Sequence, residues 1–332
     1  MHRSVCLVLG LAACGPTAAA PEDAQDTHPA TGSIAVLSGR APDISDFPDA
    51  PDAPDAPALT LIQASDESGL APDGGPVMSV VPPPQGEAGE EGRFLGMAGA
   101  LTLQLETADG VLEVRLAEVD TPVPEQTEIW LADWLEGRQL SLTYSGLRRD
   151  RYDRALAHVS AVMPDGETGA DGEAPAWLQA RLVAAGLARV MSHADNQAHA
   201  ATLLRLEAEA RRRRLGMWGD PDHAIRDTHP DARAQDIGSS QIVEGRVTDA
   251  VRLDSGRIYL NFGSDYRSDF TVRIDAADSQ DFLDANLGPE ELLGRRVRVR
   301  GWLVEENGPM IRLDHRARLE IVAEDAGEAR PR

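Results

Sequence analysis

The alternation of apolar and polar positions becomes regular near Arg93 and predicts a first β-rich unit. Residues 101–105 and 111–119 alternate as strands on either side of a turn, and two later stretches repeat the pattern at 140–144 and 154–162. Between and after these strands the apolar spacing becomes helical. It predicts helices at 125–135, at 177–185 and at 195–214, with glycine closing the first two.

A second β-rich unit is predicted from about residue 241. Its alternating stretches are typical of five strands, with a short helix near 278–285 between the third and the fourth. Five strands with one interposed helix fit a small Greek-key barrel of the OB type. The strands are expected at residues 242–247, 257–262, 270–274, 296–304 and 310–322.

Residues 15–92 show no such pattern and are rich in Pro, Ala, Asp and Gly. They carry 14 acidic residues and a single arginine, Arg40, which gives a net charge of −13. A segment of this composition cannot bury enough apolar surface to offset the entropy lost on ordering. We therefore predict a mostly disordered tether, whose apolar runs at 59–62 and 77–81 are the candidate docking points on the folded body.

The first residues, MHRSVCLVLGLAAC, have a short basic start and an apolar run too short to cross a bilayer as a permanent helix. Leu11-Ala-Ala-Cys14 resembles the lipobox of bacterial lipoproteins, which implies cleavage before Cys14 and diacylation of its thiol. The alternative is an ordinary secretory signal in which Cys14 is incidental. The expected location is the bacterial cell envelope, with a lipid anchor on the periplasmic face of the outer membrane.

The chain has a net charge of −23 over 332 residues and contains no lysine. A strongly acidic protein repels polyanions at long range, and nucleic-acid binding usually rests on positive charge. The composition therefore counts against tight, nonspecific binding of long DNA. It leaves room for a local pocket built from arginines.

Four stretches follow one another within residues 93–219: VRLAEVDTP, RDRYDRALAHV, WLQARLVAAGLARV and LLRLEAEARRRRLGMW. In this order and spacing they resemble the staphylococcal (thermonuclease-like) nuclease domain, which implies an OB-type barrel with three helices. The later stretches YLNFGSDYRSDFTV and RVRVRGWLVEENGPMIRLDH resemble the OB-like extension of some bacterial members. The implied fold class is mainly β with helices (α+β), with two OB-type Greek-key barrels in tandem after the tether.

The predicted organisation divides the chain into six segments. They are a signal peptide at 1–13, the lipidated cysteine and tether at 14–92, the nuclease-like domain at 93–220, a linker at 221–240, the OB-like domain at 241–323 and a tail at 324–332.

Hydrolysis of a phosphodiester needs positive groups for the charge that builds on the phosphoryl oxygens, a cation that polarises them and a base that positions water. Arginine forks suit the first task, and hard oxygen ligands suit Ca²⁺. The resemblance implies phosphate contacts by Arg115 and Arg154, metal ligation by Asp120 and the carbonyl of Thr121, and nucleotide contacts by Arg151 and Tyr152.

Three positions depart from the family pattern. The glutamate that acts as general base directly after Asp-Thr-Pro is Val123 here, and the metal-ligand aspartate of the first strand has no counterpart in residues 98–102. The glycine before the second arginine is Asp153. Candidate substitutes are Glu125, two residues beyond the lost base, and Glu118, which precedes the ligand aspartate by two and so shares its strand face.

These departures favour a protein that binds phosphodiesters, with weak or absent Ca²⁺ binding and impaired or absent hydrolysis. The alternative is an active Ca²⁺-dependent endonuclease that uses Glu125 as a relocated base. A third interpretation makes Arg115 and Arg154 structural partners of Asp120 and Glu118. The expected partners are nucleic acid or nucleotide phosphate, and the membrane through Cys14. The protein partner is left open, and one hypothesis is a non-enzymatic module that binds an anion, a nucleotide or an envelope partner.

Three further groups have a structural and a functional interpretation. The arginines at 211–214 are either a nucleic-acid patch or, as we favour, the solvated end of a helix. His193 and His199 are weak candidates for a metal pair, since no cysteine or glutamate spacing supports them. The last group is either a set of base-stacking platforms or core and rim aromatics: Phe262, Tyr266 and Phe270.

Overall fold

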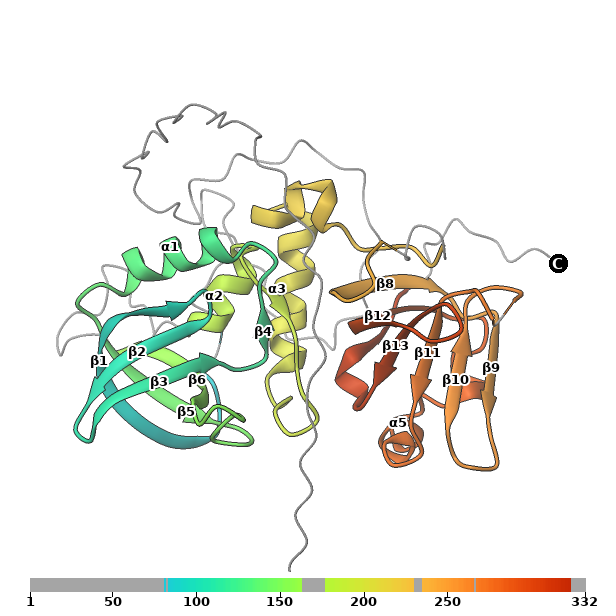
Figure 1. Ribbon diagram of the computed structural model, residues 1–332, viewed down its shortest axis with the longest axis horizontal. Coiled ribbons are helices and arrows are strands. Elements are labelled where there is room, and N and C mark those ends of the chain that lie inside the picture. The colour runs from blue at the N-terminus through green and yellow to red at the C-terminus, as the bar shows by residue number, and fades with distance from the viewer. Residues whose placement is uncertain (1–80, 82, 163–176, 230–234, 266, 324–332) are drawn as a thin grey trace, which may run out of the picture. The chain divides into compact units, whose positions relative to one another are not determined.

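A computed structural model of the chain describes residues 81, 83–162, 177–229, 235–265 and 267–323 (Figure 1). It confirms a mainly β protein with a few helices. Cys14, the predicted signal and most of the predicted tether lie outside the described residues, as does Tyr266. The described residues all belong to a single compact body. None of the helices within those ranges is long and apolar enough to span a membrane.

Five strands close into a barrel in the order β1-β2-β3-β6-β5 (Figure 1). They are β1 (Glu87–Gly99), β2 (Thr102–Thr107), β3 (Gly110–Leu116), β5 (Gln139–Tyr144) and β6 (Ala155–Val162). Neighbouring strands are antiparallel except β3 and β6, which are parallel. Their inward-facing residues form the core, which includes Leu103, Leu105, Val114, Leu140 and Leu142.

β1 begins at Glu87, inside the segment predicted as tether. The backbone of Glu87 and Ala88 pairs with the end of β5, which gives this acidic stretch a strand conformation. Its charges are also compensated, because Glu87 binds Arg148 and Glu90 binds Arg149. The strand was not predicted because the acidic, proline-rich composition was judged over the whole of residues 15–92 and not over its last few residues.

Three helices belong to the first barrel: α1 (Pro124–Leu135) packs on β1, α2 (Leu178–Ala184) on β6, and α3 (Ala200–Arg212) on α2. The predicted helix at 195–214 starts later than expected, because His193 and Asn196 pair through their backbones in a preceding turn. Two short strands, β4 (Val119–Asp120) and β7 (Arg189–Val190), form a small separate sheet. Two 3-10 turns follow α3: η3 (Gly216–Gly219) and η4 (Pro221–His223).

The second unit contains β8 (Ser240–Arg246), β9 (Asp249–Arg252), β10 (Ile258–Asn261), β11 (Thr271–Ile274), β12 (Arg296–Glu305), β13 (Pro309–Leu313) and β14 (Leu319–Ile321). β8 pairs with β12 and β9 pairs with β10, so the sheet curls on itself through the bend between β8 and β9. β11 and β13 are parallel, as β3 and β6 are in the first barrel. The two units therefore share one strand connectivity, while the OB-type assignment of the second stays a prediction.

The predicted elements of the second unit need three corrections. The strand expected at 310–322 is two strands, β13 and β14, because the 3-10 turn η5 (Arg316–Arg318) interrupts it. β9 was not predicted; its residues are mostly exposed, so they lack the alternation of a half-buried strand. The expected helix is α5 (Ser279–Asp284), and a further short helix, α6 (Pro289–Leu292), follows it.

A fully buried arginine of the second unit bonds into the first. Arg300 on β12 donates from Nη1 to Glu207 Oε2 at 2.7 Å and to the Val190 carbonyl at 3.1 Å. Its Nη2 donates to Glu320 Oε1 at 2.5 Å. Arg300 and the side chain of Glu207 are both 0 % exposed. We refer to Arg300, Glu207 and Glu320 as the Arg300 cluster.

Candidate functional site

The turn after β4 is held by two threonines that share one carbonyl acceptor. Thr121 Oγ1 donates to the Leu187 carbonyl at 2.8 Å, and Thr127 Oγ1 donates to the same oxygen at 2.9 Å. The backbone N–H of Val123 donates in turn to Thr121 Oγ1 at 3.1 Å. This network fixes the start of α1 and places Asp120 at the edge of the barrel, as the Asp-Thr-Pro motif predicts.

Arg115 lies on β3 and is partly buried. Its Nη1 and Nη2 donate to the carbonyls of Leu116 and Val119, at 3.0 and 3.2 Å. Burial lowers the pKa of Arg115 and the nearby Arg154 adds to this, whereas Asp120 and Asp150 oppose it. The structure therefore brings Arg115, Arg154 and Asp120 into one neighbourhood, as the resemblance implies.

Arg154 is held by a carboxylate that the sequence analysis did not identify. Its Nε and Nη2 both contact Asp150 Oδ2, at 2.8 and 2.7 Å, and Nη1 donates to Thr102 Oγ1 at 3.3 Å. Burial opposes ionisation of Asp150, but the bonds from Arg154 and from the backbone of Tyr152 outweigh it and lower its pKa. The structural interpretation, which named Asp120 and Glu118 as partners of the two arginines, did not include Asp150, the residue that pairs with Arg154 from four positions earlier on the same turn.

Arg151 and Tyr152 lie on that turn, with Tyr152 well exposed. The guanidinium carbons of Arg151 and Arg154 lie 4.7 and 5.2 Å from the centre of its ring. The aromatic face is thus already flanked by cations, which favours a fixed position for the ring. The turn presents a charged and aromatic surface next to Arg154.

Asp153 has φ of 64°, in the left-handed region that favours glycine. This explains in physical terms why a glycine suits the position before the second arginine. Aspartate is among the few other residues that adopt this conformation readily. The departure at Asp153 therefore keeps the backbone path of the turn while adding a negative charge beside Arg154.

The predicted oxygen ligands for Ca²⁺ are few. The carboxylate of Asp120 makes no hydrogen bond or ion pair with a described residue, although its backbone pairs with Arg189. Thr121 uses its hydroxyl within the turn network, and the predicted ligation by its backbone carbonyl stays a prediction. Thr102, opposite Arg115 in the β2–β3 register, has a hydroxyl that already accepts from Arg154 Nη1, and residues 98–102 contain no carboxylate. Since Ca²⁺ takes 6–8 oxygens, these residues do not fit it well.

The position of the general base is apolar. Val123 is the N-cap residue of α1 and packs against the core. Glu125 lies in the first turn of α1, exposed, and forms no hydrogen bond or ion pair within the described part of the chain. A carboxylate near a helix N-terminus is favoured by the helix dipole, which gives Glu125 a structural role independent of catalysis.

Glu118 does not lie beside Asp120 as predicted. Its φ of 60° breaks the strand between β3 and β4, so the alternation of faces does not carry through it. The side chain turns inward, is 2 % exposed, and meets His158 and His199. Glu118 is thereby excluded as a substitute ligand or base in the arginine site.

Glu118, His158 and His199 form a buried triad that was missed from the sequence. Glu118 Oε1 lies 3.3 Å from His158 Nε2 and 3.5 Å from His199 Nδ1, and the two ring nitrogens are 3.1 Å apart. Burial opposes ionisation of Glu118, but the histidine hydrogen bonds outweigh it and lower its pKa; burial also lowers the pKa of His158. The sequence offered one indication of this triad, His158, a histidine at a buried position of a predicted strand.

These three side chains have the spacing of a metal site, since their ligand atoms lie within 4.8 Å of one another. Their hydrogen bonds argue for a different arrangement. The Gln85 N–H donates to His199 Nε2 at 2.8 Å, which places the ring proton on Nδ1, the nitrogen facing the triad. His158 Nδ1 has no partner, although a ligating histidine normally donates its other N–H. The triad therefore fits a buried hydrogen-bond network, and its nitrogens disfavour Ca²⁺.

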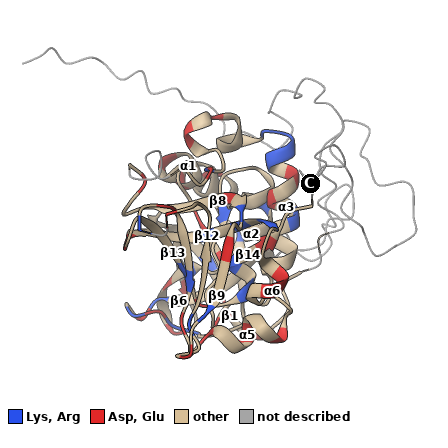
Figure 2. Ribbon diagram, turned by 90° about the vertical axis from the view of Figure 1, so that its right-hand side faces the viewer, with Lys and Arg blue, Asp and Glu red and all other residues tan. Residues whose placement is uncertain are grey.

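The remaining candidates have mainly structural positions. His193 is separate from the triad, with Nδ1 at 3.4 Å from Arg318. Arg211 is largely buried beside Glu207 and over Trp218, so the end of α3 is less solvated than predicted. Phe262 and Phe270 pack together in the second core, with ring centres 5.1 Å apart. Figure 2 shows acidic and basic positions interspersed over the described elements, with a run of arginines at the end of α3.

The comparison with known families agrees with the motifs. Residues 113–220 match the family model described as Staphylococcal nuclease homologue. The match includes Arg115, Asp120 and Arg154, and the resemblance predicted from the sequence is confirmed for this region. β1 and β2 precede the matched residues but complete the barrel. No curated protein matches the chain.

Proposed function

We propose, from the staphylococcal nuclease-like domain at residues 113–220, that this chain is a phosphodiester-binding protein with impaired or absent Ca²⁺-dependent hydrolysis. One observation supports the proposal: both arginines of the motif, Arg115 and Arg154, are present, while Asp150 forms an ion pair with Arg154 and position 123 is a valine without a carboxylate. Binding groups are retained, and the groups that hydrolysis needs are not.

Phosphate binding is supported by the donors that remain. An arginine has five N–H donors, and Arg115 uses two of its guanidinium nitrogens on backbone carbonyls. Arg154 is oriented by Asp150 and Thr102, which fixes the rest of its fork in place. Charge-assisted contacts to a phosphate are about twice as strong as neutral hydrogen bonds. They do not depend on a metal.

Impaired hydrolysis is supported by the surroundings of Val123. Without a carboxylate at this position the attacking water has no base, and loss of a general base typically costs about 10²–10⁴ in rate. Glu125 is the nearest candidate in sequence, but its side chain is exposed and nothing in the described residues orients it. A base must be held within fractions of an ångström to act.

The first test is a titration of the full chain with a nucleoside 3′,5′-bisphosphate, with and without Ca²⁺. We expect weak binding that does not require Ca²⁺ and that is lost in both Arg115→Ala and Arg154→Ala. Arg205→Ala, an exposed arginine on α3, is the matched control and should bind as the wild type does. DNA and RNA cleavage by the wild type should be slow or undetectable.

Two results would contradict the proposal. Strong Ca²⁺-dependent turnover that disappears in Glu125→Gln would make the protein an active nuclease with a relocated base. Absence of bisphosphate binding in every variant would leave the two arginines with a structural role only.

We further propose that the protein is anchored through a lipid on Cys14, in the cell envelope. The support is the lipobox-like Leu11-Ala-Ala-Cys14 at the end of a short apolar run. Diacylation supplies two chains, enough for stable anchoring. Cys14→Ser should release the protein from the membrane fraction or leave the signal uncleaved; a processed variant that stays on membranes at wild-type levels would refute the anchor.

A further inference from the structure

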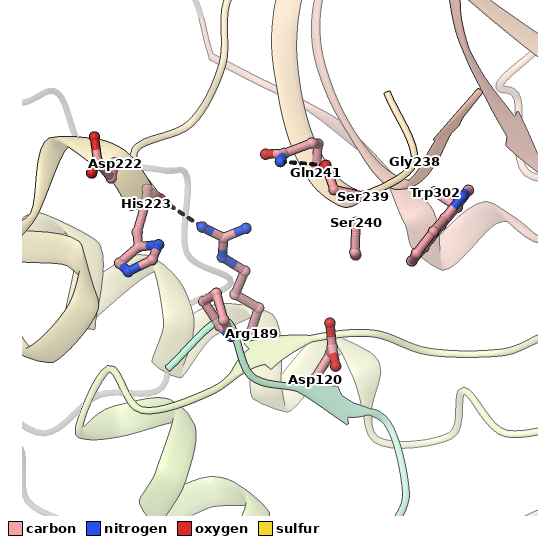
Figure 3. A pocket seen from close by; sticks show the side chains of 10 residues that line it. Asp120, Arg189, Asp222, His223, Gly238, Ser239, Ser240, Gln241 and Trp302 are labelled. Atoms are coloured by element: carbon pink, nitrogen blue, oxygen red, sulfur yellow. Dashed lines mark hydrogen bonds between the residues drawn. The ribbon is translucent and has the colours of Figure 1, made fainter. Parts of the chain in front are cut away.

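A pocket lies beside the proposed phosphate site, between β4 and β7 on one side and β8 and β12 on the other (Figure 3). Its volume is about 300 Å³, near the lower end of the range for small-molecule sites. Arg189 and Asp120 border it from the first unit, and Ser239, Gln241 and Trp302 border it from the second. A site of this size holds one ring system and excludes a duplex.

Arg189 brings a largely buried guanidinium to the wall of this pocket. The residue is 7 % exposed, and its Nη2 donates to the His223 carbonyl at 2.8 Å. Its Nε is enclosed without a hydrogen-bond partner among the described residues and is not reachable from the pocket. Its Nη1 is not among the enclosed atoms and makes no hydrogen bond with a described residue. An acceptor on a ligand in the pocket would therefore bind Nη1.

Trp302 brings an exposed aromatic face. It lies on β12 between the buried residues Gly301 and Leu303, so its side chain points away from the core of the second unit. It is 60 % exposed and faces the same space as Arg189 and Asp120 (Figure 3). An exposed indole beside polar groups is a stacking platform for a planar ring.

The charges of the pocket favour a neutral ring over a phosphate. Two carboxylates, Asp120 and Asp222, line it with the single guanidinium of Arg189. Burial lowers the pKa of both Arg115 and Arg189, and Asp120 opposes this shift in each, so its carboxylate, which lines the pocket, also acts on the arginine site. A phosphate would therefore lie at Arg115 and Arg154, with the rest of its nucleotide directed past Asp120.

We propose that this pocket holds a single nucleobase, stacked on Trp302, of a nucleotide or unpaired strand whose phosphate lies at Arg115 and Arg154. The inference rests on the proposed function and names its ligand. Guanine fits the polar groups best. Its amino and imino groups donate to the carboxylate of Asp120, and its carbonyl and ring nitrogen accept from Arg189, the base atoms that arginine commonly contacts.

The test compares two probes with the same phosphates, guanosine 3′,5′-bisphosphate and abasic deoxyribose 3′,5′-bisphosphate, on the full chain. The wild type should bind the guanosine probe roughly 5- to 100-fold more tightly, the range expected for stacking of one base. Trp302→Ala should abolish that difference without weakening the abasic probe. Trp302→Phe should keep most of it, and Leu253→Ala, another exposed apolar residue of the second unit, should change nothing.

The outcomes separate this inference from the proposed function. Equal affinity for the two probes in the wild type, or no effect of Trp302→Ala, overturns the base pocket while leaving the arginine site intact. Binding of the guanosine probe alone, lost in Trp302→Ala but retained in Arg115→Ala, supports the pocket and overturns the phosphate site. Binding of neither probe overturns both.

Discussion

Replacing Arg300 with methionine should lower the free energy of unfolding by about 3–5 kcal/mol, the usual cost of removing one partner of a buried ion pair. Burial opposes the charge of Arg300, but Glu207 and Glu320 outweigh it and raise its pKa. The variant would leave Glu207 buried without its closest countercharge, since Arg211 lies farther away at 3.5 Å. Chemical denaturation followed by circular dichroism would measure the loss.

Two comparisons separate the charge effect from packing. Arg300→Met combined with Glu207→Leu removes both charges and should recover much of the stability, because apolar replacement of a buried pair is often neutral or stabilising. Arg312→Met removes an exposed partner of Glu306 and should cost less than about 1 kcal/mol. Equal losses for Arg300→Met and Arg312→Met would show that burial of the cluster contributes little.

Gly186→Ala should destabilise the protein by about 2–5 kcal/mol, through strain and overpacking together. Gly186 ends α2 with φ of 69°, and the Leu187 N–H donates to the Leu182 carbonyl across it. A Cβ at this position would lie 2.1 Å from the carbonyl oxygen of Leu215, which is backbone and cannot rotate away. Thermal unfolding of the variant would show the loss as a lower Tm.

Gly137→Ala isolates the backbone part of this cost. Gly137 has nearly the same φ, 72°, but a Cβ there would meet nothing within 4 Å. Its replacement should cost only about 1–2 kcal/mol. If Gly186→Ala lowers the stability no more than Gly137→Ala does, the predicted clash with Leu215 is absent and the backbone near Leu215 must move without cost. The link matters for the site, because Leu187, next to Gly186, supplies the carbonyl that Thr121 and Thr127 share.

Four strands of the first barrel could be predicted because one face of each is buried, which leaves a period of two in the sequence. β1 was not predicted, since most of its residues are exposed or half-buried. The same reasoning failed at Glu118, where a single residue with positive φ shifts the faces of everything that follows. The sequence placed Glu118 beside Asp120, whereas the backbone turns it into the interior. Counting residues to decide which face of a strand a side chain occupies is valid only while the strand is continuous.

Local sequence motifs predicted more of the candidate site than the periodicity of apolar residues did. The Asp-Thr-Pro turn and the two arginines lie near one another, as the resemblance implies. Asp150 was missed although it stands four residues before Arg154, because its role depends on a turn in which its carboxylate also accepts backbone N–H groups. The Trp302 pocket joins residues more than 180 positions apart along the chain, and no local pattern predicts such a meeting.

The Arg300 cluster has a bearing on where this protein can be divided. The family match ends at residue 220, yet Glu207 and the Val190 carbonyl, both inside it, receive their hydrogen bonds from a strand 80 residues further on. A fragment that ends at residue 220 would contain Glu207 but would lack Arg300, its partner in the buried ion pair. The end of the family match is therefore not the end of a segment that would fold by itself. If the second unit were exchanged for another, the new unit would need an arginine at the position of Arg300.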